Sequence, residues 1–150
     1  MQDTVDTSAD DIVVDLLVTA GRLTRLAGSI SDDDLPRAIL RAMALLDEHG
    51  SLRVSEFARI DRCSQPAATA LVNRLVDEGF ATRSKDPEDS RAVRVELTDA
   101  GRDRLNQARR AFGTVLATGL ADFDHDRLTR LATDMNDLLT ALRAVARGHQ

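Results

Sequence analysis

Residues 64–83 read SQPAATALVNRLVDEGFATR, and the chain continues at residues 86–101 as DPEDSRAVRVELTDAG. The first stretch starts with Ser64, a favoured N-cap residue, and Pro66 suits the first turn of a helix. Gly79 is typical of the position just after a helix. The apolar residues between them recur at helical spacing: Ala68, Leu71, Val72, Leu75 and Val76. The stretch therefore predicts one helix between Ser64 and Gly79.

A β-hairpin is predicted directly after this helix. Residues Phe80 to Arg83 suit a short strand, and residues Val93 to Leu97 alternate apolar and charged side chains as a half-buried strand does. The polar stretch from Ser84 to Ser90 is expected to be the loop between the two strands. Thr98 is placed to cap the helix that follows the hairpin.

Three helices are expected before residue 64 and two after residue 98. An apolar series at helical spacing predicts the first over about residues 10–30. Pro36 is expected in the first turn of the second helix, which Gly50 ends. A short third helix is expected from Ser55 to Ile60, followed by the polar turn Asp61-Arg62. Further apolar series of the same spacing predict the two later helices.

Two helices joined by a short turn and followed by a hairpin make a winged helix-turn-helix. The fold class predicted is therefore mainly α, with a winged helix-turn-helix domain, a two-stranded antiparallel wing, and further helices at both ends of the chain. In this arrangement the second helix of the pair enters the major groove of double-stranded DNA. The sequence thus predicts a DNA-binding protein and not an enzyme.

Candidate base-reading residues lie on the face of the recognition helix that its apolar face leaves free. Helical geometry turns Gln65, Thr69 and Asn73 outward, and Gln and Asn side chains can pair with adenine edges. The small Ala67 would let the helix backbone approach the groove closely. Ser64 and Arg74 are expected to position the helix on phosphates.

Basic side chains of the predicted hairpin supply a second candidate contact with DNA. Arg91 at the tip, flanked by Lys85 and Arg94, is expected to reach the adjacent minor groove or its phosphates. Acidic residues of the loop would repel phosphate if they all faced the DNA. Asp89 is therefore expected to hold Arg91 or to cap the loop backbone.

These residues resemble the recognition helix and wing of the MarR family of transcriptional regulators. The wing pattern consists of Asp89, Arg91, Val95, Leu97, Thr98 and Gly101, and the likeness is close over residues 53–101. The resemblance implies a homodimer built on the terminal helices, with Arg91 in the minor groove, and a small-molecule effector bound between those helices and the DNA-binding lobe. With few aromatic residues in the chain, such a pocket would be aliphatic.

The resemblance also gives an organisation to the whole chain. Residues 1–150 are expected to form one domain, with a winged helix-turn-helix lobe over about residues 35–100. The dimerisation helices are expected over about residues 10–30 and 100–147, which carry more apolar positions than one lobe can cover. A two-fold dimer would read a pseudo-palindromic operator, with half-sites roughly 10 bp apart. The function predicted is sequence-specific DNA binding, as a repressor of transcription.

The formal net charge of −5 argues against a nucleic-acid partner, because Lys and Arg supply most non-specific affinity for DNA. Its distribution favours one, because acidic residues crowd the first 34 residues and basic residues gather in the middle. Those basic residues are Arg53, Arg59, Arg62, Arg74, Arg83, Lys85, Arg91 and Arg94. The net charge and the acidic wing leave one alternative open, a winged-helix protein-interaction module that does not bind DNA.

Cys63 is the only cysteine, which excludes an intrachain disulfide. Its place beside the recognition helix leaves a second alternative open, a Cys63-based redox sensor, although buried cysteines are generally inert. The three histidines, His49, His125 and His149, lie too far apart in sequence for metal-ligand spacing, so no metal and no cofactor are expected. An acidic N-terminus and the lack of an apolar run of ~20 residues predict a cytoplasmic protein without a membrane partner.

Overall fold

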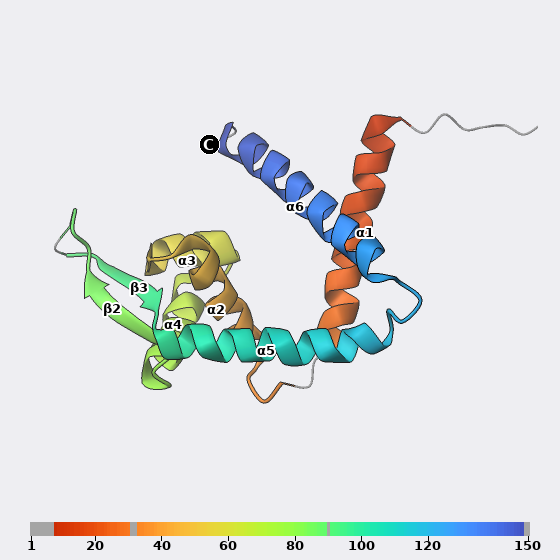
Figure 1. Cartoon of the computed structure of the whole chain (residues 1–150). Helices are drawn as coiled ribbons and strands as arrows, with labels where there is room; N and C mark the ends of the chain where they lie inside the picture. Colours follow the sequence, from red (N-terminus) through yellow and green to blue (C-terminus); the bar gives the residue numbers. More distant parts are fainter. Residues whose placement is uncertain (1–7, 31–32, 90, 149–150) are drawn as a thin grey trace, which may run out of the picture. The chain divides into compact units, whose positions relative to one another are not determined.

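The computed structural model describes residues 8–30, 33–89 and 91–148. The chain groups into two compact units, residues 1–113 and 114–150. Figure 1 labels the helices and strands. In chain order these elements are α1 (Ala9–Ile30), α2 (Arg37–His49), β1 (Leu52–Arg53), α3 (Val54–Asp61), α4 (Gln65–Asp77), β2 (Ala81–Lys85), β3 (Val93–Leu97), α5 (Asp99–Thr118) and α6 (His125–Gly148).

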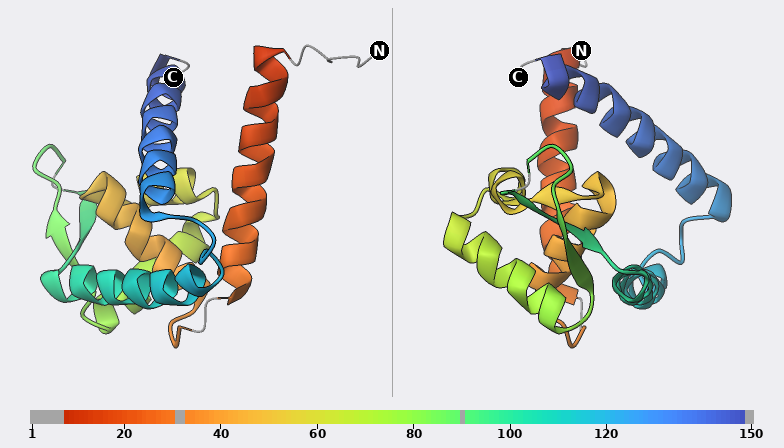
Figure 2. Two further views of the ribbon diagram at one scale, coloured as in Figure 1. Left: turned by 45° about the vertical axis from the view of Figure 1, so that its right-hand side comes forward. Right: turned by 90° about the vertical axis from the view of Figure 1, so that its left-hand side faces the viewer.

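The core of the first unit lies where α2, α3 and α4 pack against one another and against the sheet. Two views in Figure 2 show the hairpin extending away from these short helices. The most deeply buried large side chains of this core are Phe57, Ile39, Met43, Leu46, Leu75, Val72 and Val95. The helix-turn-helix and the hairpin therefore share one hydrophobic core, so the position of the hairpin is tied to that of the helices.

The sheet has three antiparallel strands in the order β1-β3-β2. The mainly α fold and the two-stranded β2–β3 wing are confirmed, and β1 adds a third strand that the sequence did not predict. Leu52 pairs with Val95 and Arg53 with Arg94, so β1 forms the third strand. A strand of two residues is too short to show alternation, which is why its pattern could not be read from the sequence.

The end of α4 is a Schellman motif that reverses the chain into β2. Gly79 has a left-handed φ of 76°, its N–H donates to the Val76 carbonyl oxygen, and the Phe80 N–H donates to that of Leu75. Gly79 therefore ends the helix as predicted. The strand that follows runs to Lys85, two residues beyond the predicted limit at Arg83, because those two residues pair with β3.

The start of α5 packs closely on the turn between α4 and β2. Thr98 Oγ1 accepts a hydrogen bond from the Gly101 N–H and donates one to the Gly79 carbonyl oxygen. This confirms the predicted cap. At Gly101 a Cβ atom would lie only 2.1 Å from the Phe80 carbonyl oxygen. The backbones approach so closely that only glycine fits.

The start of α2 differs slightly from the expectation. Pro36 occupies the N-cap position and not the first turn, and its carbonyl oxygen accepts from the Ile39 N–H. Just before it, the Asp33 carboxylate accepts from the Leu35 N–H and is paired with Arg104 of α5. That pair holds the pKa of Asp33 below its ordinary value. Ser31 and Asp32 of the same acidic run lie outside the described residues.

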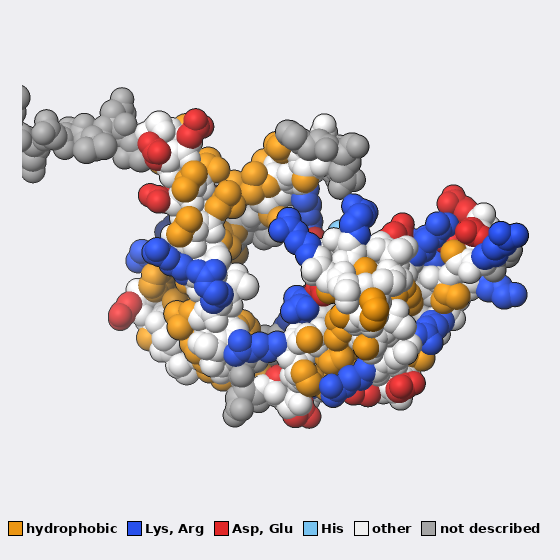
Figure 3. All heavy atoms as spheres, turned by 180° about the vertical axis from the view of Figure 1, so that it is seen from behind, with side chains coloured by type: hydrophobic (Ala, Val, Ile, Leu, Met, Phe, Trp, Pro, Cys, Tyr) orange, Lys and Arg blue, Asp and Glu red, His pale blue; other side chains and the backbone are white. Residues whose placement is uncertain are grey.

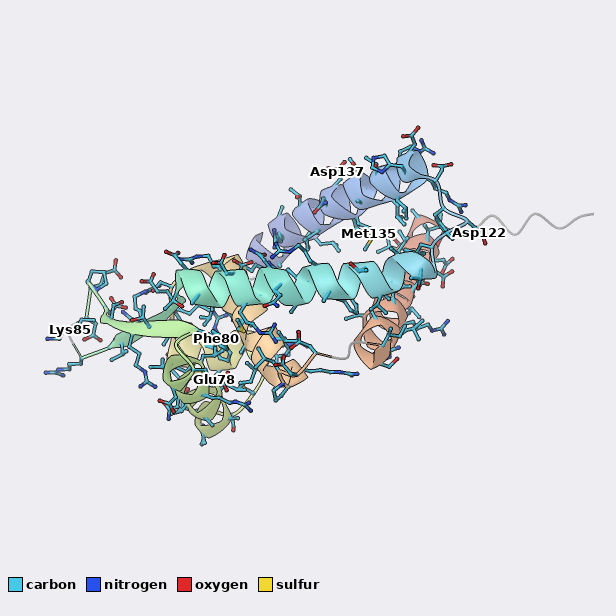
Figure 4. The ribbon with its side chains drawn as sticks, turned by 60° about the horizontal axis from the view of Figure 1, so that its bottom comes forward. Glu78, Phe80, Lys85, Asp122, Met135 and Asp137 are labelled. Atoms are coloured by element: carbon cyan, nitrogen blue, oxygen red, sulfur yellow. The ribbon has the colours of Figure 1, made fainter. Side chains whose placement is uncertain are left out.

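Large apolar side chains are exposed along α1, which has no buried residue, and Figure 3 shows apolar side chains on the side of α1 that faces the viewer. They are Ile12, Val13, Val14, Leu16, Leu17, Val18, Leu23, Leu26 and Ile30. In the second unit, α6 likewise exposes Leu131, Met135, Leu139 and Val145. Figure 4 shows Met135 and Asp137 on opposite sides of α6, so that helix is amphipathic.

Candidate nucleic-acid interface

The recognition helix α4 divides into a buried face and an exposed face. Ala68, Val72 and Leu75 are completely buried in the core. The exposed face carries every helix residue that the sequence predicted at a DNA interface: Gln65, Ala67, Thr69, Asn73 and Arg74. A polar face of this kind, on the second helix of a helix-turn-helix, is what a major groove accepts.

Hydrogen bonds at the start of α4 fix its first turn. The Ser64 hydroxyl oxygen accepts from the Ala67 N–H across 3.3 Å, so Ser64 is the N-cap that the sequence predicted. Thr69 Oγ1 donates to the Gln65 carbonyl oxygen across 2.9 Å. The Gln65 side chain is exposed at the N-terminal end of the helix, where the partial positive charge of the helix dipole favours phosphate.

Two arginines contact side chains of α4. Arg74 pairs with Glu78 one turn further along, with 2.8 Å between Nε and Oε1. Arg83, on β2, donates from its guanidinium to Oδ1 of Asn73. The sequence placed Arg83 in the basic middle of the chain but gave it no role, because its neighbour lies ten residues away across the turn at Gly79.

The tip of the wing carries Lys85 and Arg91, and both side chains are exposed. Figure 4 places Lys85 at the far end of the hairpin. Beside them, the Asp89 carboxylate accepts a hydrogen bond from the Arg91 N–H across 3.0 Å. Of the two roles expected for Asp89, this contact corresponds to the cap on the loop backbone.

Asp86 is the residue that sequence reasoning missed. It begins the wing loop, yet its side chain is completely buried and pairs with both Arg53 and Arg94. The hydrogen bond from Arg53 holds the pKa of this carboxyl well below its ordinary value, and the Glu88 N–H and Arg94 act in the same direction. Asp86 therefore anchors the loop and does not face a phosphate.

Arg94 occupies a different place from the one expected of it. Its guanidinium donates to Oδ2 of Asp86, to Oγ of Ser51 and to the Ser51 carbonyl oxygen. These contacts direct the side chain along the base of the wing, toward the segment before β1. The charge of Arg94 is thus used to hold the hairpin, while Lys85 and Arg91 remain at its tip.

The turn of the helix-turn-helix is held by an ion pair. Arg41 of α2 donates two hydrogen bonds to Asp61, at 2.7 and 3.0 Å, and lowers the pKa of that carboxyl. Arg62 then takes a left-handed φ of 53°. Burial raises the pKa of the neighbouring Cys63 thiol, and Asp61 adds to that effect. A protonated thiol is a poor nucleophile, which argues against the redox reading.

Among the described residues, no three side chains of His, Cys, Asp or Glu come together as a metal site. His149 lies outside that part of the chain. No helix in the described ranges is long and apolar enough to cross a membrane. A hollow also lies within the first unit. Its lining is Asp33, Asp34, Arg104, Gln107 and Ala111.

A shared core, an exposed recognition helix and a basic hairpin tip define a winged helix-turn-helix protein. A family model described as the MarR family matches residues 35–93. The HTH-type transcriptional regulator Mb0904 of Mycobacterium bovis is 31% identical over 98 residues, which cover 64% of this chain and 68% of that protein. The chain belongs to the MarR family, and its curated relatives are named HTH-type regulators or repressors of transcription.

Other relatives are more distant or match a shorter stretch. The regulator YpoP of Bacillus subtilis is 36% identical over 72 residues, 48% of this chain, and the chain spans about half (51%) of its length. The repressor MdtR of the same organism is 25% identical, and the match covers 83% of this chain and 84% of MdtR. A solved structure of a mutant MarR from E. coli, complexed with operator DNA, aligns with a TM-score of 0.55 at 22% identity, over 82% of this chain and 95% of that one.

Proposed function

We propose that this protein is a homodimeric repressor of transcription that binds double-stranded DNA in a sequence-specific manner. The observation that carries the proposal is the outward polar face of α4, whose other face is locked into the core by Ala68, Val72 and Leu75. A rigidly held helix can place side chains on base edges, since its backbone does not yield on contact. A mutant MarR of E. coli, which shares the fold, was solved in complex with operator DNA, and this supports DNA as the partner.

Each exposed residue of α4 receives a role from its chemistry. Gln65, Thr69 and Asn73 contact base edges, since amides and hydroxyls match the donors and acceptors of the major groove. Ser64 and Arg74 contact phosphates that flank the groove. Ala67 is exposed and small, so the first turn of the helix can approach the DNA closely.

The wing supplies the second contact. Arg91 enters the minor groove and Lys85 neutralises a neighbouring phosphate, because both side chains are exposed at the tip of the hairpin. Asp89 shapes the loop through its bond to the Arg91 N–H. Arg94 is left out of the proposed contact set, because its guanidinium is used by Asp86 and Ser51.

A dimer accounts for the exposed apolar faces of the end helices. Large aliphatic side chains on α1 and α6 would remain in water in an isolated chain, at a cost of roughly 25 cal/mol per Å² of apolar surface. We assign about residues 10–30 and 100–147 to dimerisation and about 35–100 to the DNA-binding lobe. Two recognition helices related by a two-fold axis would then read a pseudo-palindrome.

The proposed repressor role, and its control by a small molecule, are inferred from the family to which the chain belongs. MdtR is named a repressor, and a bound dimer that covers an operator blocks transcription by occupancy. A small-molecule effector would act by changing the spacing of the two recognition helices. The protein would carry out this function in the cytoplasm, where the DNA is.

Selection of bound fragments from random DNA tests the proposal most broadly. We expect enrichment of a pseudo-palindrome with half-sites about 10 bp apart. Enrichment of no sequence, with affinity insensitive to salt, would favour the protein-interaction module. Cys63→Ser provides a further control, since operator binding that an oxidant abolishes in the wild type but not in this variant would instead favour the redox sensor.

A further inference from the structure

Asn73 and Arg83 form one hydrogen-bonded unit on the exposed side of the lobe. The Arg83 guanidinium donates to Oδ1 of Asn73, and both side chains are exposed. Arginine has only donors, so the oxygen of the Asn73 amide must be the atom that faces it. The contact therefore fixes which way the amide is turned and leaves its Nδ2 hydrogens as the free donors.

The backbone turn makes this contact a property of the fold. The Schellman motif at Gly79 sends β2 back along α4, and the two elements pack against each other. Arg83 lies in the middle of β2, paired with Val95, which is completely buried. The strand position that holds Arg83 beside α4 is thus set by the core.

An amide turned in this way is suited to a particular base. Reading adenine requires the Asn oxygen to accept from the N6 amino group while the nitrogen donates to N7. Beside Asn73 that amino group would meet a cationic guanidinium that is itself a donor. Guanine presents two acceptors, O6 and N7, and no donor at the same edge.

We propose that Arg83 positions the Asn73 amide so that Asn73 reads guanine, not adenine, in the operator half-site. This assignment rests on the proposed function and replaces the adenine pairing expected from an isolated Asn. Arg83 is a positioning residue in this scheme, because it acts through the amide of Asn73. Its charge adds to the attraction of the lobe for DNA as well.

Fragment selection with matched variants tests the assignment. Asn73→Ala identifies the position that Asn73 reads, as the one whose base preference disappears. At that position the wild type is expected to favour guanine over adenine by roughly tenfold. Arg83→Met keeps the aliphatic length but removes the donors, so guanine and adenine should become about equal there while the rest of the operator is unchanged.

Arg74→Met is the control, because Arg74 is a neighbouring arginine whose partner is Glu78. It should weaken binding and leave the guanine preference intact. Adenine preferred by the wild type at this position, or a guanine preference that survives Arg83→Met, would overturn the assignment. Failure to enrich any DNA would instead overturn the proposed function.

A second measurement needs no DNA. The side-chain amide of Asn73 in the free protein, followed by ¹⁵N relaxation, should gain picosecond-to-nanosecond mobility in Arg83→Met and not in Arg74→Met. Equal mobility in wild type and Arg83→Met would show that Arg83 does not hold the amide. The positioning role would then be wrong whatever DNA the protein binds.

Discussion

Oδ2 of Asp86 accepts a hydrogen bond from Nε of Arg53 across 2.7 Å, although 33 residues separate the two in the sequence. Arg53 lies on β1 directly before α3, and Asp86 begins the loop of the wing. Arg94 of β3 adds a third member at 3.2 Å. The ion pair thus links the hairpin to the helix-turn-helix. It therefore helps to fix the wing relative to α4, the two elements proposed to contact DNA.

Asp86→Asn is expected to lower the midpoint of thermal unfolding and to weaken operator binding. The amide keeps the shape of the side chain but leaves the guanidinium groups of Arg53 and Arg94 without their shared carboxylate. Glu88→Gln is the matched control, because it removes a charge from the same loop at an exposed position. Equal unfolding midpoints for the two variants would contradict the anchoring role of Asp86.

At acid pH, the contribution of Asp86 to the free energy of unfolding should disappear. Its pKa is ordinarily 3.8 in an unfolded chain and is lower in the folded protein. The unfolded state therefore binds the proton more readily, and the stabilisation is present above about pH 4 and is lost as the pH falls through the folded pKa. Denaturant titrations from pH 6 to pH 2 should show the difference between wild type and Asp86→Asn shrinking. A difference in stability that grows toward acid pH would contradict a lowered pKa of Asp86 in the folded protein.

Gly101→Ala should destabilise the fold by about 2–4 kcal/mol or more, because its Cβ would lie 2.1 Å from the Phe80 carbonyl oxygen. Gly113 on the same helix has no atom within 4 Å of such a Cβ. Gly113→Ala should therefore stabilise α5 by about 0.5–1 kcal/mol. Chemical denaturation of both variants decides the matter, and two changes of the same sign would refute the close packing at Gly101.

Ser64→Ala is expected to cost about 1 kcal/mol of unfolding free energy, since the N–H of Ala67 loses its acceptor. Amide hydrogen exchange should speed up in the first turn of α4 in this variant. Ser55→Ala, at an exposed position near the start of α3, should change the unfolding free energy by less than about 0.5 kcal/mol. If the exchange rates in α4 stay unchanged, Ser64 does not cap the helix.

Local signals made the frame of the lobe predictable from the sequence. Ser64 and Gly79 are residue types that favour the two ends of a helix. The spacing of Ala68, Val72 and Leu75 predicts the buried face of that helix. Each of these signals lies within one helix, so no knowledge of distant residues is needed. The outward position of Asn73 followed from the same spacing.

The parts that could not be predicted depend on contacts between distant segments. The burial of Asp86 could not be predicted, because it depends on Arg53, which lies on a strand of two residues. Arg94 is expected at the DNA from its charge and its place beside the hairpin tip, whereas its guanidinium contacts Asp86 and Ser51. The contact between Arg83 and Asn73 could not be predicted either, because it forms only once the chain turns at Gly79.

The central claim is that α4 and the wing bind DNA, and the salt dependence of operator affinity tests it most directly. Affinity should fall steeply with salt, with a log–log slope that grows by about 0.9 for each phosphate contact. In a dimer carrying two copies, Lys85→Ala should reduce that slope by about 2, and Arg91→Ala should weaken binding to most sequences. An affinity unchanged by Arg91→Ala together with a slope unchanged by Lys85→Ala would contradict the account of the wing. No salt dependence in the wild type would contradict DNA binding itself.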